Sequence, residues 1–121
     1  MEKLLPYKFV DDERGAFLGI TRDSWAEVNF IETRAGQVRG GHYHKETREL
    51  FFIISGEIGV VLDDMKSGKH TEFTVKKGDI FVVEAYELHT FYIRTAAQWI
   101  NMLSQRLDPQ EPDFHRPKKA A

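Results

Sequence analysis

The chain contains no cysteine among its 121 residues, and this absence narrows the chemistry open to it. Without thiols there can be no disulfide, no thiolate metal site and no cysteine nucleophile. Any metal ion must therefore be held by nitrogen and oxygen atoms, which histidine and carboxylate side chains supply. The lack of cysteine does not by itself fix the cellular compartment.

Long apolar runs and a strong charge of one sign are also missing. No stretch approaches the roughly 20 apolar residues that cross a bilayer, and residues 1–10 lack the basic and apolar regions of a signal peptide. We therefore expect a cytoplasmic protein with no membrane partner. Lys and Arg number 17 against 19 Asp and Glu, so no strongly basic surface is present and we expect no nucleic-acid partner.

Short apolar segments separated by turn residues make up most of the chain, and no apolar stripe of helical period interrupts them. This pattern predicts an all-β protein of one domain over residues 1–107. Besides the segment around His42, we expect strands over residues 4–10, 16–20, 25–33, 50–54, 58–62, 73–75, 80–83, 88–93 and 98–103.

Two apolar segments exceed what the interior of one small barrel needs. Residues 4–10 read as an edge strand or as an arm laid over a neighbouring subunit, and either arrangement would bury their apolar side chains. Residues 50–54 are continuously apolar, as in a strand covered on both faces. Together they predict a homodimer.

The last segment, residues 108–121, changes in composition. Prolines and charged residues outnumber side chains that could pack in a core. We expect an extended and partly mobile tail outside the barrel.

Three histidines and a glutamate predict a metal site. His42 and His44 are separated by one residue, so on a strand both imidazoles leave the same face, with Cα atoms about 7 Å apart. Glu49 follows a short polar turn, and His89 opens a later strand. Burying all four in a barrel is costly unless they share a cation, so we predict one divalent ion, with Zn, Mn, Fe and Ni all possible.

The same residues carry a resemblance to the cupin superfamily. Its first motif is Gly, five residues, His-x-His, four residues, Glu, six residues and Gly, and the segment from Gly36 to Gly56 meets every interval. In the second motif Gly78 and His89 fall in register, although the Pro and Gly between them are replaced. The resemblance implies a single-domain cupin β-barrel, also called a double-stranded β-helix or jelly roll.

A further resemblance concerns two arginine segments. Residues 39–43 resemble the Arg-Gly-x-His-Tyr segment of dTDP-4-dehydrorhamnose 3,5-epimerases, and residues 12–17 resemble their Asp-x-Arg-Gly-x-Phe segment. The resemblance implies that Arg14 and Arg39 contact a nucleotide diphosphate, which suits a bidentate guanidinium, and that His42 is the general base. Their acidic residue two places after the Phe is a glycine in this chain.

Two other sugar-modifying groups resemble the chain. Residues 39–44 and 99–113 are similar to the metal-binding C-terminal cupin domain of capsular-polysaccharide nucleotide-sugar reductases. The dTDP-sugar 3,4-ketoisomerases share the tandem histidines without Glu49. The presence of Glu49 places the chain nearer to the metal-binding group.

The candidate substrate contacts are apolar side chains and Arg39. Strand alternation places Phe51 on the face of Glu49 and Phe91 on that of His89, as an apolar wall, and the epimerase resemblance adds Phe17. A regular strand would place Arg39, three residues before His42, on the opposite face.

The proton-transfer groups are less well defined. A His42 that ligates an ion cannot also serve freely as a base. Tyr86 and Glu84, in the loop before His89, are therefore the other catalytic candidates.

These observations favour an epimerase or isomerase acting on a nucleotide-linked keto-sugar in deoxy-sugar or surface-polysaccharide biosynthesis. Two alternatives stay open. Three His and one Glu on a six-coordinate ion leave two positions for substrate and oxygen, as in a metal-dependent dioxygenase. A non-catalytic cupin that binds a sugar or a metal for a partner enzyme is the other.

Overall fold

The computed structural model describes residues 3–117, and over this range every regular element is a β-strand. The strands are β1 (Lys3–Leu4), β2 (Lys8–Asp12), β3 (Gly15–Gly19), β4 (Glu27–Thr33), β5 (Val38–His42), β6 (Glu49–Ser55), β7 (Ile58–Asp64), β8 (His70–Val75), β9 (Ile80–Val83), β10 (Glu87–Ile93) and β11 (Ala97–Leu103). The all-β prediction is confirmed. None of these residues belongs to a helix long and apolar enough to span a membrane.

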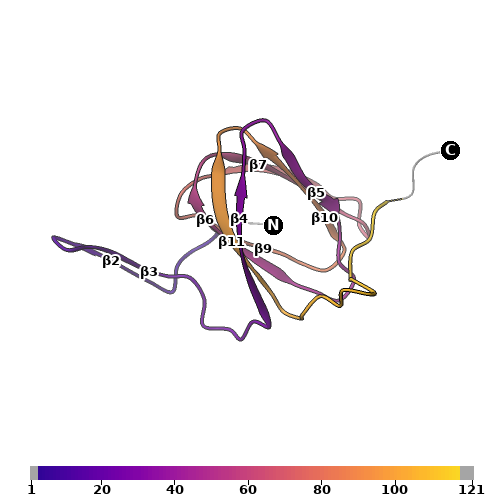
Figure 1. Ribbon diagram of the computed structural model, residues 1–121, viewed down its shortest axis with the longest axis horizontal. Helices are drawn as coiled ribbons and strands as arrows, with labels where there is room; N and C mark the ends of the chain where they lie inside the picture. The colour runs from indigo at the N-terminus through magenta and orange to yellow at the C-terminus, as the bar shows by residue number, and fades with distance from the viewer. Residues whose placement is uncertain (1–2, 118–121) are drawn as a thin grey trace.

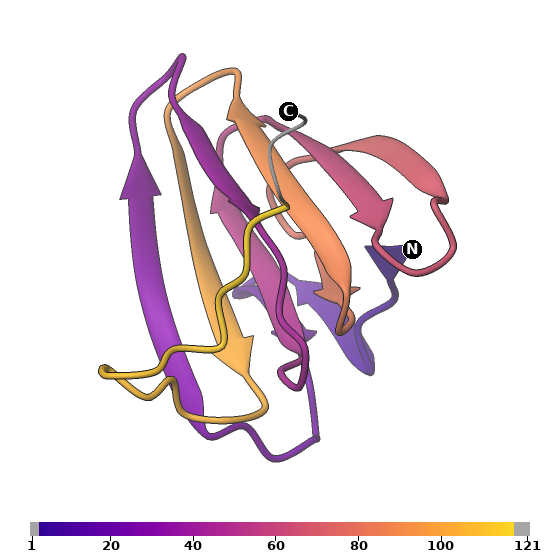
Figure 2. The same ribbon diagram turned by 90° about the vertical axis from the view of Figure 1, so that its right-hand side faces the viewer.

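Two antiparallel sheets face each other. One has five strands in the order β1-β9-β6-β11-β4, and the other has four in the order β5-β10-β7-β8. Figures 1 and 2 show the two layers curving around a shared interior without closing into one continuous barrel. From β4 to β11 the chain crosses from one sheet to the other at every connection except β7–β8, so residues distant in the chain meet inside.

The main core lies between the two sheets and follows strand alternation. In β11, Ala97, Trp99, Asn101 and Leu103 are buried, while Gln98, Ile100 and Met102 between them are partly exposed. The predicted alternation is confirmed for Phe51 and Phe91, which are both only 2% exposed and pack in the same cluster. This packed interior fixes the strand ends that carry the polar site.

A second, smaller apolar cluster covers the outer face of β6. Leu50 packs there with Ile80 and Val82, against side chains that include Leu18 and Trp25. The prediction that residues 50–54 are covered on both faces is therefore confirmed, but the cover comes from the same chain. This strand by itself gives no argument for a second subunit.

The β2–β3 hairpin projects away from the sheets (Figure 1). Phe9 is 58% exposed and Phe17 is 53% exposed. The expectation that the apolar side chains of residues 4–10 are buried is wrong within one chain, because only β1 joins a sheet, as the edge partner of β9. The hairpin strands pair only with each other.

The C-terminal segment lies against the four-stranded sheet beside β5. Tyr43 and His115 exchange two backbone hydrogen bonds, of 2.9 and 3.0 Å, and the segment, yellow in Figure 2, runs past the end of β5. The expectation of a tail that does not pack is wrong for residues 113–115. Residues 1–2 of the predicted arm and 118–121 of the predicted tail lie outside the described range.

Candidate functional site

Four polar side chains converge at one end of the space between the sheets. Donor atoms of His42, His44, Glu49 and His89 all lie within 4.8 Å of one another. His42 ends β5, Glu49 begins β6 and His89 lies in β10, while His44 lies two residues beyond β5. Only His42 is more than slightly exposed; the other three are buried.

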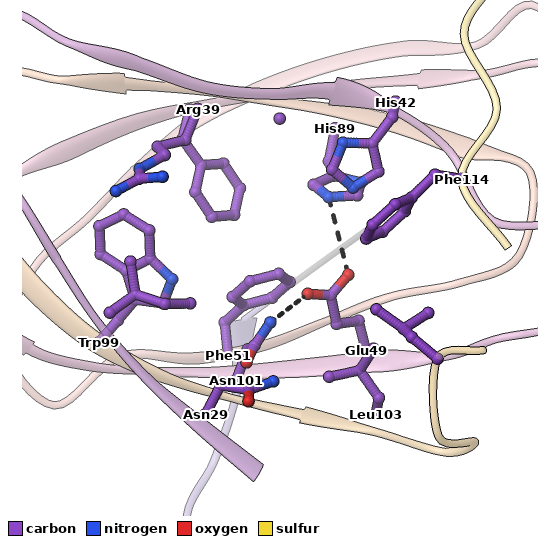
Figure 3. A pocket seen from close by; sticks show the side chains of 14 residues that line it. Asn29, Arg39, His42, Glu49, Phe51, His89, Trp99, Asn101, Leu103 and Phe114 are labelled. Atoms are coloured by element: carbon purple, nitrogen blue, oxygen red, sulfur yellow. Dashed lines mark hydrogen bonds and ion pairs between the residues drawn. The ribbon is translucent and has the colours of Figure 1, made fainter. Parts of the chain in front are cut away.

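Glu49 is the centre of this cluster. Its Oε1 lies 2.8 Å from His44 Nε2 and 3.7 Å from His89 Nε2. Its Oε2 accepts a hydrogen bond of 2.6 Å from the Asn101 amide (Figure 3). Two imidazole nitrogens therefore face Oε1 of Glu49, and the Asn101 amide orients Oε2.

The protonation of the cluster follows from burial and from the shared carboxylate. Burial is the largest influence on both His44 and Glu49 and opposes their charged forms, but the hydrogen bond and charge attraction between them, with further hydrogen bonds to Asp113 and from Asn101, together outweigh it. The pKa of His44 is therefore raised and that of Glu49 is lowered. Burial and the neighbouring His89 lower the pKa of His42 to about 4. Burial also lowers the pKa of His89. His42 and His89 are therefore neutral near pH 7, the form that ligates metals.

The donor set fits a divalent transition-metal ion. Three imidazole nitrogens and one carboxylate oxygen, three of the four side chains being buried, are ligands typical of Zn, Mn, Fe or Ni sites. The other ring nitrogen of His44 lies 2.6 Å from the backbone carbonyl of Asp113, an outer contact common in metal-ligating histidines.

A pocket of about 320 Å³ extends from the cluster between the sheets. Figure 3 shows His42, His89, Glu49 and Phe114 at one end, and Arg39 and Trp99 at the other. The lining residues are Asn29, Ile31, Arg39, Gly40, His42, Glu49, Phe51, His89, Phe91, Trp99, Asn101, Leu103, Leu107 and Phe114.

Arg39 lies on the same side of β5 as His42. The prediction that it lies on the opposite face is wrong, because β5 is not regular: His42 pairs with His89 and Gly40 pairs with Thr90, leaving Gly41 as an extra residue. Gly40 has φ +88°, and a Cβ there would lie 2.4 Å from the carbonyl oxygen of His89. Glycine permits this bulge and the close approach of β10.

The Arg39 guanidinium is held from the neighbouring strand. Its Nε donates to Thr33 Oγ1 at 3.1 Å, and its Nη2 donates to the carbonyl of Glu32 at 3.4 Å. These contacts hold the cationic group at the pocket end away from the histidines.

Four predicted site residues lie elsewhere. Arg14 is at the hairpin tip, where it binds the carboxylate of Asp12, and Phe17 is on the same hairpin. Glu84 pairs with Arg48 on the surface, and Tyr86 lies in the following turn with φ +68°. None of the four lines the pocket of this chain.

Sequence reasoning missed several lining residues. Asn101 is an amide at an inward position of β11, between Trp99 and Leu103, and this break in an apolar alternation was a usable signal. Phe114 is a single aromatic residue in a polar tail, and its ring centroid lies 4.5 Å from that of His42. Asp113 gave no comparable signal, because it acts through contacts that only the fold creates.

Comparison with known families gives one match that spans most of the chain. Residues 10–114 match the family model described as the polysaccharide biosynthesis C-terminal domain. None of the curated proteins compared with the chain by sequence matches it.

Several solved structures share the fold. A dTDP-4-dehydrorhamnose 3,5-epimerase from Sulfolobus tokodaii superposes with a TM-score of 0.76 and 23% identity, covering 88% of this chain and 72% of that one. The Campylobacter jejuni TDP-quinovose 3,4-ketoisomerase WlaRB gives 0.79 and 17%, covering 93% and 90%. These likenesses confirm the cupin fold.

A third similar structure is much longer than the chain. The capsular polysaccharide assembling protein CapF of Staphylococcus aureus gives a TM-score of 0.70 and 21% identity, covering 95% of this chain and 34% of that one. The chain thus spans about a third of CapF.

Proposed function

The chain belongs to the polysaccharide biosynthesis C-terminal domain family, and from this premise we propose that it is a metal-binding cupin that epimerises or isomerises a nucleotide-linked keto-sugar. One observation carries the proposal. A single pocket joins the cluster of His42, His44, Glu49 and His89 to the guanidinium of Arg39. The ion cluster suits the ketone oxygen of a sugar, and the guanidinium suits a phosphate group.

The ion site would be formed by the four clustered side chains. A divalent ion bound there would supply a Lewis acid beside the ketone oxygen and so ease loss of a proton from the adjacent carbon. The chain itself keeps this end of the pocket apolar through Phe51, Phe91 and Phe114, which limits competing water.

His42 is the lining residue best placed to accept that proton. It is the most exposed member of the cluster, and its pKa of about 4 leaves the imidazole neutral near pH 7. Glu84 and Tyr86 do not line the pocket, so the base role falls to His42. The roles of ligand and base compete for one imidazole, and a single substitution separates them.

Beyond the ion cluster the pocket has groups suited to a sugar nucleotide: Arg39 and Trp99 lie at the far end (Figure 3), and Asn101 lies beside Glu49. Arg39 offers a planar cation, which suits a diphosphate. The indole N–H of Trp99 and Oδ1 of Asn101 are buried without a hydrogen-bond partner among the described residues, and both residues line the pocket. A donor and an acceptor of this kind fit sugar hydroxyls. A similar epimerase from Legionella pneumophila was solved with dTDP-4-keto-L-rhamnose.

A homodimer would complete the site. The β2–β3 hairpin exposes Phe9, Val10 and Phe17, an apolar surface that no other part of the described residues covers. Contact with a second copy would bury this surface, and would also give Arg14 and Phe17 a route to a pocket that they do not reach in one chain.

Proton exchange tests the proposal. The protein, supplied with Zn²⁺ or Mn²⁺ in D₂O, is incubated with dTDP-4-keto-L-rhamnose and related keto-sugars, and NMR detects deuterium at the carbon next to the ketone. Exchange without redox change supports the proposal. Oxygen consumption would favour the dioxygenase, and binding with neither signal would favour a non-catalytic cupin.

His42→Ala assigns the role of the competing imidazole. Loss of exchange with the ion retained gives His42 the base role. Loss of the ion itself gives it the ligand role.

A further inference from the structure

The C-terminal strap, defined as residues 113–115, fastens the loop that joins two members of the cluster. The Asp113 carboxylate accepts backbone hydrogen bonds from Lys45, Glu46 and Thr47, at 2.9, 2.9 and 3.1 Å. It also accepts the Thr47 hydroxyl at 2.9 Å. Four residues lie between His44 and Glu49, and one carboxylate binds the backbone N–H groups of three of them; the fourth, Arg48, donates to Ser104.

The main chain of the strap contacts His44 directly. The carbonyl oxygen of Asp113 lies 2.6 Å from His44 Nδ1. A carbonyl oxygen can only accept, so Nδ1 must carry the proton. The ring then presents Nε2 to Glu49 and to the centre of the cluster.

The rest of the strap keeps Asp113 in place. The paired backbone bonds between Tyr43 and His115 fix the register of the strap beside the chain that leads to His44. His115 Nε2 donates to Asp113 Oδ1 at 2.8 Å. Phe114, between them, packs its ring 5.3 Å from that of His44.

We propose that Asp113 is the positioning residue of the ion site: by anchoring the strap to the turn after His44, it sets which nitrogen of His44 faces the ion. The inference rests on the proposed ion site for its purpose, while the bond from His44 Nδ1–H to the Asp113 carbonyl that it relies on exists without an ion. Asparagine cannot replace the carboxylate, since one of its two polar atoms is a donor and would face the N–H groups of the turn.

The matched variants are Asp113→Asn and Asp108→Asn. Both remove one negative charge from the C-terminal segment, but among residues 3–117 the Asp108 carboxylate accepts a hydrogen bond only from the nearby Gln110 N–H, at 2.8 Å. Thr47→Val is a milder variant that deletes a single bond to Asp113. Circular dichroism confirms that each variant is folded.

The first readout needs no metal. In protein treated with chelator and labelled with ¹⁵N-histidine, NMR should detect a slowly exchanging Nδ1–H of His44 in the wild type and in Asp108→Asn. Asp113→Asn should lose this protection. If Asp113→Asn keeps it, the proposal is overturned, whether or not the site ever binds an ion.

The second readout is Zn²⁺ affinity, measured by competition with a fluorescent chelator. Loss of an outer contact to a metal-ligating histidine typically weakens binding 10–100-fold, so we expect a loss of about that size in Asp113→Asn and a smaller one in Thr47→Val. Asp108→Asn should stay within about twofold of the wild type. An Asp113→Asn protein with wild-type affinity would refute the positioning role. A wild type that binds no Zn²⁺ would instead count against the proposed function, and the NMR result would still decide the role of Asp113.

Discussion

The two arginines that sequence motifs singled out lie in opposite surroundings. Arg39 lines a pocket and is bonded to Thr33 and to the backbone of Glu32. Arg14 is at the tip of a projecting hairpin, where its side chain bonds, within residues 3–117, only to the neighbouring Asp12. Arg39 is part of a pocket formed by a single chain, whereas Arg14 lies on an exposed hairpin.

The two sheets form a pocket within one chain, whereas the hairpin leaves an apolar surface exposed. The sheets bury their apolar side chains and bring four ligand-type groups together. The hairpin leaves the aromatic side chains of Phe9 and Phe17 exposed. A function that uses both regions therefore requires the hairpin to meet another surface.

The largest effect should come from the cluster between the sheets. His42→Ala combined with His89→Ala removes two of four ligand-type groups, so we expect loss of stoichiometric metal and a fall of more than about 10³-fold in proton exchange. Elemental analysis and deuterium NMR measure the two losses. His70→Ala is the control, because His70 is exposed and binds only Asp63 and Glu72. If the double variant retains stoichiometric metal, the ion is bound elsewhere and the predicted site is wrong.

The next effect concerns the hairpin. Phe9→Ser combined with Phe17→Ser removes two exposed aromatic side chains, each worth about 1.5–3 kcal/mol when fully buried. We expect the dimer to dissociate about 100-fold more readily, as read by light scattering across micromolar concentrations, with metal content unchanged. Tyr92→Ser is the control, because Tyr92 is 49% exposed but lies on the barrel. A monomeric wild type would contradict this prediction.

Arg39→Ala tests whether the Arg39 end of the pocket binds the phosphate groups of the substrate. Hydrogen bonds to charged groups contribute about 1.5–3 kcal/mol, so we expect dTDP-sugar affinity to fall about 10–100-fold by calorimetry. Arg39→Lys keeps the charge but loses the planar fork, and should recover only part of the affinity. Unchanged binding in Arg39→Ala would exclude this end as the phosphate subsite.

Arg14→Ala sharpens the same comparison. An affinity loss in this variant, together with dimer formation, would show that the hairpin of one copy reaches the pocket of the other. A loss of less than about twofold, with the dimer intact, would limit the hairpin to assembly.

The smallest predicted effect is a pH dependence in chelator-treated protein. The pKa of His42 is lowered from 6.5 to about 4 in the fold, so between these values the unfolded chain binds a proton that the folded one does not. Stability is therefore lost as the pH falls through this range.

A comparison with His42→Asn isolates this contribution. From about pH 7.5 to about pH 5 the wild type should lose about 2 kcal/mol more unfolding free energy than the variant, by urea titration. His44 contributes with the opposite sign, because its pKa is raised, and this contribution is common to both proteins. Parallel pH profiles would show that His42 is not buried as described.

Sequence spacing predicted most of the strands and the convergence of His42, His44, Glu49 and His89, while the cupin fold was implied by the resemblance to the cupin motifs. Those features depend on side-chain alternation and on turn lengths, which are visible locally. The position of Arg39 was not predictable in this way, because an extra residue at Gly41 reverses the face that counting assigns.

Long-range contacts explain the other differences. Asp113 lies far along the chain from the turn that it organises. The proline-rich and charged segment around it predicts only an extended tail. The hairpin carries the aromatic side chains of Phe9 and Phe17, but no surface formed by residues 3–117 covers them. Local sequence patterns identify neither the turn that Asp113 binds nor the surface that would cover the hairpin.

The position of each ligand-type residue within its sheet has a kinetic consequence. Glu49 begins β6, which has β9 and β11 on its two sides, whereas His42 ends β5, an edge strand paired only with β10. Backbone amides in central strands exchange with solvent deuterium slowly, and edge strands open at lower free energy. An ion held between them would leave when β5 frays and releases His42, long before the domain unfolds, so its residence time should follow the opening rate of one strand.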